Sequence, residues 1–203
     1  ANSSFYNGFG NPDTQQFGSN LSAQYAPGNA NGYPDTAQTD GVIGKVTYSW
    51  NKSEDTMLYV TMSEGFRPGL LNRPVGSSSP DGTYTVKPSI ESDEITNYEF
   101  GWKAVLQDGA LRFNGSVFLV DVSGLQSTIF DPSIVNLFFS DNAADAEIKG
   151  VEGDILYYTD SGLILSGAFS ILNTEITKSL VPTADVVVGS HLAFAPGFQA
   201  NFS

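Results

Sequence analysis

The chain has 203 residues, a formal net charge of −13 and a sequence isoelectric point near 4.1, with 12% aromatic residues, 15% charged residues and no cysteine. This balance argues against a nucleic-acid partner, because phosphate binding needs clustered lysine and arginine. The lack of cysteine excludes disulfides and thiolate metal sites. No apolar run approaches the roughly 18 residues of a membrane helix, which disfavours a helical membrane protein.

Residues 1–40 are rich in Asn, Gly, Ser, Gln and Pro, with scattered aromatic residues and neither a helical nor a strand period. This composition predicts one long loop. Loops beyond about 15 residues are uncommon in compact domains and are usually functional or disordered. A ligand-facing loop and a flexible segment therefore both remain open for this part of the chain.

A period-two pattern, typical of strands, begins at Val42 and continues through Trp50. A short polar turn at residues 51–55 leads into a second strand, which ends at Arg67-Pro68-Gly69 because proline cannot donate to the ladder. A second long loop follows to about Ile90, and Pro80-Asp81-Gly82 predicts a small hairpin within it.

The clearest strand covers residues 92–104, where apolar and polar side chains alternate. Tyr98, Phe100 and Trp102 share one face, whereas Glu99 and Lys103 share the other. In a soluble sheet the apolar face would meet a core. In an outer-membrane barrel it would meet lipid, and the polar face would line the lumen.

The remaining chain predicts four more strands, the last of them beginning at Phe198. Tight turns are expected at residues 107–110 and 160–162, and long loops at residues 124–143 and 175–190. Short and long connections thus alternate, as in bacterial outer-membrane barrels. We therefore predict an all-β fold: an antiparallel transmembrane β-barrel segment, about seven strands of a larger barrel, with long extracellular loops.

The barrel hypothesis assigns side chains to two environments. Tyr98, Phe100 and Trp102 are predicted to face lipid. The charged residues of the opposite face are predicted to line a wet lumen; they are Glu99, Lys103, Arg112, Glu152 and Asp154. Loop residues whose rings or charges suit a ligand are the candidates for binding; they are Arg67, Arg73, Phe130, Phe138 and Phe139.

Catalytic and metal sites have little support. Glu152 and Asp154 resemble a pair of catalytic carboxylates, but a wet lumen accounts for them. His191 is the only histidine, and neither a nucleophile elbow nor a second histidine accompanies it. The acidic residues of 141–147 miss the EF-hand spacing. We expect no catalytic residue, no metal site and no cofactor.

Four stretches resemble the barrel of TonB-dependent outer-membrane receptors. Ser-Glu-Gly-Phe-Arg-Pro-Gly at residues 63–69 is similar to a strand-to-loop signature of that family, and Asn-Tyr-Glu-Phe-Gly-Trp-Lys at 97–103 is similar to one of its strands. Residues 142–152 resemble the segment that re-enters the membrane after a long loop, and residues 195–201 resemble the start of a later strand. The four stretches occur in the family's order.

This resemblance implies that residues 41–203 are part of a receptor barrel, truncated at both ends, and that residues 1–40 are an extracellular loop. Family barrels have about 22 strands around a plugged lumen. The implied function is TonB-dependent uptake of a ferric siderophore, cobalamin or an oligosaccharide across the bacterial outer membrane. Implied partners are outer-membrane lipid, an extracellular small-molecule ligand, and TonB, engaged through a plug segment that this chain lacks.

Two other hypotheses remain at this stage. One is a passive barrel, either a porin or a small structural barrel of eight strands. The other is a secreted β-sandwich that binds a sugar or a partner protein. The substrate cannot be derived from the chain, because specificity in such receptors depends on loops and plug together.

Overall fold

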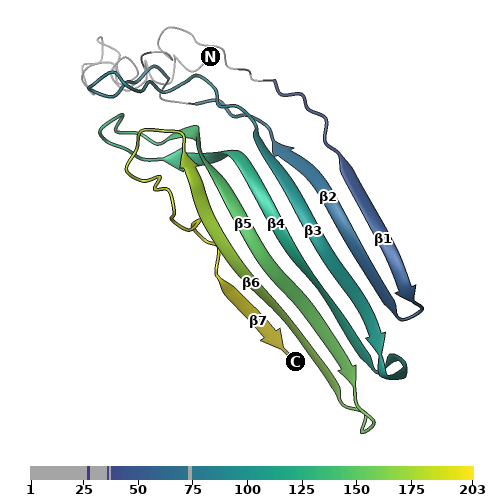
Figure 1. Cartoon of the computed structure of the whole chain (residues 1–203). Coiled ribbons are helices and arrows are strands. Elements are labelled where there is room, and N and C mark those ends of the chain that lie inside the picture. Colours follow the sequence, from purple (N-terminus) through teal and green to yellow (C-terminus); the bar gives the residue numbers. More distant parts are fainter. Residues whose placement is uncertain (1–26, 28–35, 37, 73–74) are drawn as a thin grey trace.

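A computed structural model describes residues 27, 36, 38–72 and 75–203. Its seven strands form one antiparallel sheet in which each strand pairs with the next along the chain (Figure 1). The strands are β1 (Lys45–Ser53), β2 (Thr56–Arg67), β3 (Asp93–Leu106), β4 (Leu111–Ile129), β5 (Phe139–Tyr158), β6 (Ile164–Ser179) and β7 (Phe198–Phe202). The all-β, antiparallel prediction is confirmed.

The connections sort to opposite ends of the sheet. Short turns, including the 3-10 turn η1 (Gln107–Gly109), lie at one end, and the long connections lie together at the other (Figure 1). Gly109 and Gly162 adopt φ angles of 95° and 82° in these turns, which residues with a Cβ rarely adopt. The predicted alternation of tight turns and long loops is confirmed.

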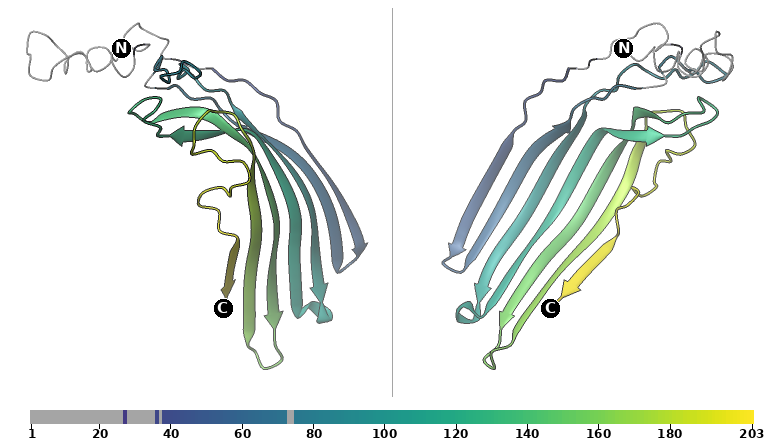
Figure 2. Two further views of the ribbon diagram at one scale, coloured as in Figure 1. Left: turned by 60° about the vertical axis from the view of Figure 1, so that its left-hand side comes forward. Right: turned by 180° about the vertical axis from the view of Figure 1, so that it is seen from behind.

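The sheet is curved and unclosed, with β1 at one edge and β7 at the other (Figure 2). The described residues contain no second sheet packed against it, so the β-sandwich hypothesis is wrong. A curved single sheet with two free edges is what part of a larger barrel would look like. The chain thus has the architecture of a partial barrel.

The strand register sorts side chains into two faces. One row crosses all seven strands and is entirely apolar; it consists of Tyr48, Val60, Phe100, Val117, Val151, Ile171 and Phe198. The adjacent row points the opposite way and contains Ser49, Tyr59, Gly101, Ser116, Glu152, Ser170 and Gln199. We call the first the aromatic face, which carries Tyr98, Phe100 and Trp102, and the second the polar face, which carries Glu99, Lys103 and Glu152.

Two strands continue into the predicted 124–143 loop, which is therefore wrong in its bounds. β4 extends to Ile129 and β5 begins at Phe139. The ladder is irregular between Val122 and Gln126, and then pairs again from Gln126 opposite Asn142. This bulge breaks the apolar alternation and hides the strand in the sequence. β6 likewise continues to Ser179, within the predicted 175–190 loop.

The buried apolar residues lie at the loop end of the sheet and not along its middle. A cluster that we call the loop-end core comprises Tyr84, Val86, Ile129, Ile134, Val135, Phe139, Ala143 and Val181. It joins the long β2–β3 connection to the ends of β4 and β5. Along the middle of the sheet, in contrast, large apolar side chains such as Tyr48, Val60 and Phe100 are exposed.

Aromatic rings cover glycines on neighbouring strands. A Cβ added to Gly115 would overlap the indole of Trp102, and one added to Gly167 would crowd the ring of Phe202. On the polar face, a Cβ at Gly101 would overlap the ring of Tyr59. Such cross-strand pairs shield the backbone at glycine and help to hold the register.

We predict that Gly115→Val destabilises the folded protein, because the new side chain must displace the indole of Trp102. Overpacking of this kind typically costs about 1–3 kcal/mol. Gly65→Ala is the control, since an added Cβ there has no heavy atom within 4 Å. Urea unfolding of both variants measures the effect. Equal midpoints would contradict the proposed packing.

Candidate functional site

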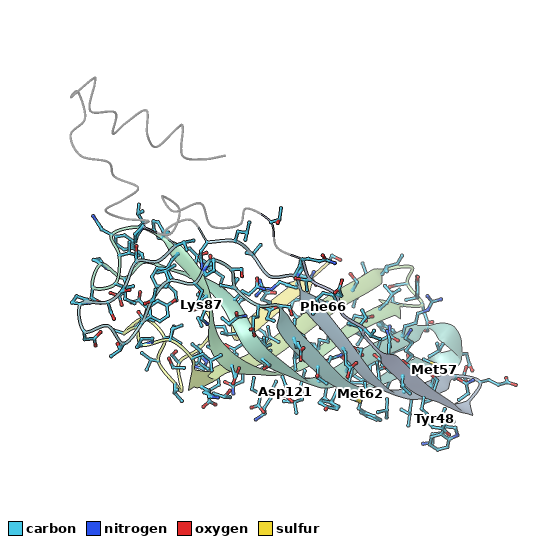
Figure 3. All side chains as sticks on the ribbon, turned by 90° about the horizontal axis from the view of Figure 1, so that it is seen from above. Tyr48, Met57, Met62, Phe66, Lys87 and Asp121 are labelled. Carbon is cyan, nitrogen blue, oxygen red and sulfur yellow. The ribbon has the colours of Figure 1, made fainter. Side chains whose placement is uncertain are left out.

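The aromatic face forms a continuous apolar band on one side of the sheet. Figure 3 labels Tyr48 and Met62 along this side. Between Tyr98 and Leu106, strand β3 is about 27 Å long at about 3.4 Å per residue. A strand tilted by about 40°, as in outer-membrane barrels, would span about 21 Å of this length along the membrane normal. This height is close to the apolar band of about 25 Å on outer-membrane barrels.

A row of carboxylates bounds this band toward the loop end. Glu64, Asp121, Glu147 and Glu175 occupy neighbouring strands on the aromatic face, and Thr96 lies between the first two. The Lys149 ammonium lies 2.5 Å from a Glu147 carboxylate oxygen. The charged row marks where the apolar band ends, since isolated charges are expensive in hydrocarbon.

The polar face carries a hollow of about 450 Å³. Its lining includes Tyr59, Lys103, Asn114, Glu152 and Asp154. The register places all five charged residues that were predicted to face the lumen on this one face, namely Glu99, Lys103, Arg112, Glu152 and Asp154. It places Tyr98, Phe100 and Trp102 on the aromatic face.

Neutral donors satisfy the carboxylates of the polar face. The Tyr59 hydroxyl donates to Glu99 at 2.5 Å, the Asn114 amide donates to Asp154 at 3.0 Å, and the Ser116 hydroxyl is 3.4 Å from Glu152. The ion pairs within 4.0 Å in the described part of the chain involve other carboxylates. They join Arg67 to Asp93, Lys87 to Asp141 and Lys149 to Glu147. The hollow thus presents two carboxylates, Glu152 and Asp154, and one ammonium group, Lys103, to water or to an occupant.

An ion pair ties the loop ends of β2 and β3 together, with its aspartate buried and its arginine half-exposed. Asp93 is fully buried, and its carboxylate binds the Arg67 guanidinium and accepts from the backbone N–H groups of Arg67 and Gln126. Burial by itself raises the pKa of Asp93, but these hydrogen bonds outweigh it and hold the pKa below its usual range. The carboxylate is therefore ionised at neutral pH.

Two amide side chains connect separate loops to the sheet. The Gln126 amide donates to the carbonyls of Pro68 and Glu91 at 3.0 Å. The Asn142 amide donates to the carbonyls of Glu91 and Gly124, and its oxygen accepts from the Glu91 N–H. Both residues lie where β4 and β5 extend beyond the predicted strands, so sequence patterns did not single them out for this role.

The described residues 70–72 and 75–90 form an irregular hairpin whose side chains contact the loop end of β5. Asp141 of β5 is 2% exposed and accepts from the Tyr84 hydroxyl at 2.6 Å, with the Lys87 ammonium at 3.4 Å. Burial, and then the bond to Asp141, raise the pKa of Tyr84, so the phenol remains a donor. The predicted turn at Pro80-Asp81-Gly82 is present, with Gly82 N–H donating to Ser79.

The predicted ligand residues fall into different environments. The Arg67 guanidinium is engaged by Asp93, and Phe139 is 2% exposed within the loop-end core. Phe130 and Phe138 are 41% and 67% exposed, with ring centroids 4.9 Å apart. Arg73 lies outside the described residues. The exposed aromatic pair is thus the part of this set that remains open to a ligand.

A tight turn supports that aromatic pair. The Asp131 carboxylate accepts from the Ser133 hydroxyl at 2.5 Å and from its N–H at 2.9 Å, and the Asp131 carbonyl accepts from the N–H groups of Ile134 and Val135 at 3.0 Å. Ile134 and Val135 are buried in the loop-end core. Phe130 and Phe138 therefore project from a loop whose other half is packed.

No helix among the described residues is long and apolar enough to cross a bilayer. Within residues 38–72 and 75–203, no group of three or more acidic or histidine side chains is arranged to hold a metal ion. Asp141, which the sequence placed in an acidic stretch, is instead bonded to Tyr84 and Lys87.

Comparison with protein families gives one match over nearly the whole chain. The model of the TonB-dependent receptor-like β-barrel matches residues 3–203. A comparison with curated protein sequences finds no match.

Solved structures share the fold at low sequence identity. The ferric yersiniabactin uptake receptor FyuA of Yersinia pestis has a TM-score of 0.57 and 16% identity, covering 79% of this chain and 22% of the receptor. The ferric-catecholate import receptor Fiu of E. coli K12 has a TM-score of 0.53 and 14% identity, covering 78% and 21%.

The ferripyoverdine receptor of the Pseudomonas aeruginosa outer membrane, solved with ferripyoverdine bound, has a TM-score of 0.51 and 17% identity, covering 79% of this chain and 19% of the receptor. The chain thus spans about a fifth of the length of these receptors.

We predict that the contribution of Asp93 to stability depends on pH. Because its folded pKa is lowered, this contribution is present above the ordinary carboxylate pKa and is lost as pH falls through the lower folded value. Asp93→Asn should reduce the free energy of unfolding by about 1–3 kcal/mol at pH 7, and by less at pH 3.

Urea unfolding at both pH values, with Glu94→Gln as the control, measures this effect. Glu94 is an exposed carboxylate beside Asp93 on the same strand. A difference between wild type and Asp93→Asn that stays constant from pH 7 to pH 3 would show that the ionised form of Asp93 has no special role.

Proposed function

The chain belongs to the family of TonB-dependent receptor β-barrels, and we propose that it forms part of an outer-membrane receptor for TonB-dependent uptake of a large, scarce solute. The family is one of transport receptors, and the structural neighbours named above are uptake or import receptors for ferric ligands. A ferric siderophore is the first substrate class to test, followed by cobalamin and an oligosaccharide.

The aromatic face meets lipid in this proposal, and the polar face lines the lumen. The apolar row that crosses all seven strands, with rings such as Tyr48, Phe100 and Phe198 exposed, supports the lipid assignment. A soluble protein would expose a large apolar surface here, which is rare without a partner. This continuous row is the observation that carries the proposal.

The proposed orientation places the loop end outside the cell. Short turns on the periplasmic side and long loops outside are the rule for outer-membrane barrels, and Figure 2 shows the long connections gathered at one end. Residues 41–203 would then belong to the barrel. Residues 1–40, which lie almost entirely outside the described residues, are proposed to belong to the extracellular side. The exposed rings of Phe130 and Phe138 lie at this end and are proposed to contact the ligand.

Uptake in this proposal involves no covalent chemistry. Extracellular loops capture the solute, and a plug, supplied by a segment outside this chain, is then displaced by force transmitted through TonB. The hollow on the polar face, whose carboxylates Glu152 and Asp154 are bonded to neutral donors, would receive cationic side chains of that plug. The attraction of these carboxylates to a cation would be stronger in the assembled receptor, because a plug that excludes water lowers the local dielectric constant.

We predict that the complete receptor fractionates with the outer membrane and that its uptake requires TonB. Radiolabelled ferric siderophores, cobalamin and oligosaccharides are each supplied to cells with and without the receptor, and with and without TonB. Uptake should disappear when either protein is deleted. Recovery in the soluble fraction, or uptake that persists without TonB, would contradict the proposed function.

We also predict that Phe100→Lys destabilises the protein in a bilayer by about 2–4 kcal/mol, the cost of a lysine at the lipid face near the midplane. Asn114→Lys is the matched control, because Asn114 lies on the polar face and bonds Asp154, which a lysine can pair. Folding titrations into liposomes compare the two. Equal tolerance of both substitutions would overturn the assignment of the faces.

A further inference from the structure

The β4–β5 and β6–β7 connections pack together at the loop end of the sheet (Figure 1). Ile134 and Val135 of the first connection share the loop-end core with Val181 of the second. The Thr183 side chain of the second connection also hydrogen-bonds the Asp131 carboxylate of the first. Residues 130–138 and 180–185 therefore form one surface, which we call the paired-loop surface.

Apolar side chains are exposed on the paired-loop surface. The rings of Phe130 and Phe138 lie with their centroids 4.9 Å apart and are both exposed, as are Leu137 and Leu180. The face of an aromatic ring carries the negative part of its quadrupole. It therefore attracts C–H groups and cations and repels anions.

Carboxylates accompany these rings without any basic side chain. The sequence of the paired-loop surface contains Asp131 and Asp185 but neither lysine nor arginine. Hydrogen bonds from the Ser133 hydroxyl, the Ser133 N–H and the Thr183 side chain lower the pKa of Asp131. The Asp131 carboxylate is therefore ionised at neutral pH, and the Asp185 side chain is exposed to water.

The described cations at the loop end of the strands lie beside carboxylates of their own. Arg67 pairs with Asp93 and Lys87 pairs with Asp141. Lys178 is opposite Asp145 in the β5–β6 ladder. An anion on the paired-loop surface would thus meet carboxylates and negative ring faces, with no cation supplied by the surface itself.

We propose that the paired-loop surface binds a part of the solute that carries no negative charge, and that it disfavours anionic solutes. This inference rests on the proposed function and selects among its solutes by charge. Rings that stack on the C–H face of a sugar, or on the apolar surface of an uncharged iron chelate, would satisfy the chemistry of the surface.

The charge criterion separates the solutes that are open to this family of receptors. A plain oligosaccharide is uncharged, and a ferric ion held by three hydroxamates is also neutral because the ligand charges cancel that of the iron. A ferric ion held by three catecholates keeps a net negative charge. The first two kinds of solute therefore fit the paired-loop surface, whereas the third does not.

The charge of the surface can be measured without any solute. A fluorophore is attached at Leu137→Cys in the complete receptor, with any cysteine outside this chain replaced by serine. Relative to the free dye, iodide should quench at least about twofold less than caesium, because surface potentials of the order of kT change local ion concentrations by this much. The difference should disappear in about 1 M salt, where the Debye length is about 3 Å.

Two variants identify the source of this charge. Asp131→Asn combined with Asp185→Asn should remove most of the difference between iodide and caesium, and asparagine can still accept the bonds from Ser133. Asp108→Asn is the matched control, because Asp108 is an exposed carboxylate in the turn at the opposite end of the sheet. It should leave the quenching at Leu137→Cys unchanged.

Binding of paired probes tests the selectivity. Maltoheptaose is compared with its sulfated form, and a neutral ferric trihydroxamate with a ferric tris-catecholate, by calorimetric titration of the complete receptor at low salt. In the pair that binds, the uncharged probe should bind about tenfold or more tightly, since like charges in contact are costly. The pair that binds also distinguishes a sugar from an iron chelate.

Iodide quenching equal to or stronger than caesium quenching would overturn the proposal, and so would equal or tighter binding of an anionic probe. If none of the four probes binds while the quenching pattern holds, the charge of the surface is supported and the proposed solutes are contradicted. The inference and the proposed function can therefore fail separately.

Discussion

The antiparallel ladder is the constraint on which the rest of this structure depends. Each strand pairs with its neighbour in sequence, so the register of one pair determines the faces of the next. A slip of one residue would exchange the rows of Phe100 and Glu99 and put carboxylates among the apolar side chains. The cross-strand rings over Gly101, Gly115 and Gly167 oppose such a slip, because each fits only a partner without a side chain.

Between the apolar band and the loop end, the strands contact the long connections. There β4 and β5 act as a support for loops, and the buried polar groups Asp93 and Asp141 join connections that are distant in sequence. Burial of two carboxylates is stable only because each receives several donors. The loop end therefore combines a small apolar core with specific polar links, whereas the apolar side chains of the band below it are exposed.

The sequence predicted the strands, the turns and the two faces well, because alternation with period two is a strong signal and glycine-containing turns interrupt it clearly. It failed where the alternation is broken by the bulge near Val122, and it therefore assigned Gln126 and Asn142 to a loop. The roles of Asp93 and Asp141 were also missed, since their partners Arg67 and Tyr84 are remote along the chain. Among the ligand candidates, sequence alone could not separate buried Phe139 from exposed Phe138.

The most direct test of the central claim, that the aromatic face meets lipid, is the quenching of tryptophan fluorescence by brominated lipids. This chain has two tryptophans, Trp50 and Trp102, and both lie on the aromatic face in one row with Leu58. The complete receptor is reconstituted with any tryptophan outside this chain replaced by phenylalanine. We predict strong quenching by lipid-borne bromine and weak quenching by aqueous acrylamide. Strong acrylamide quenching without any effect of brominated lipid would contradict the account.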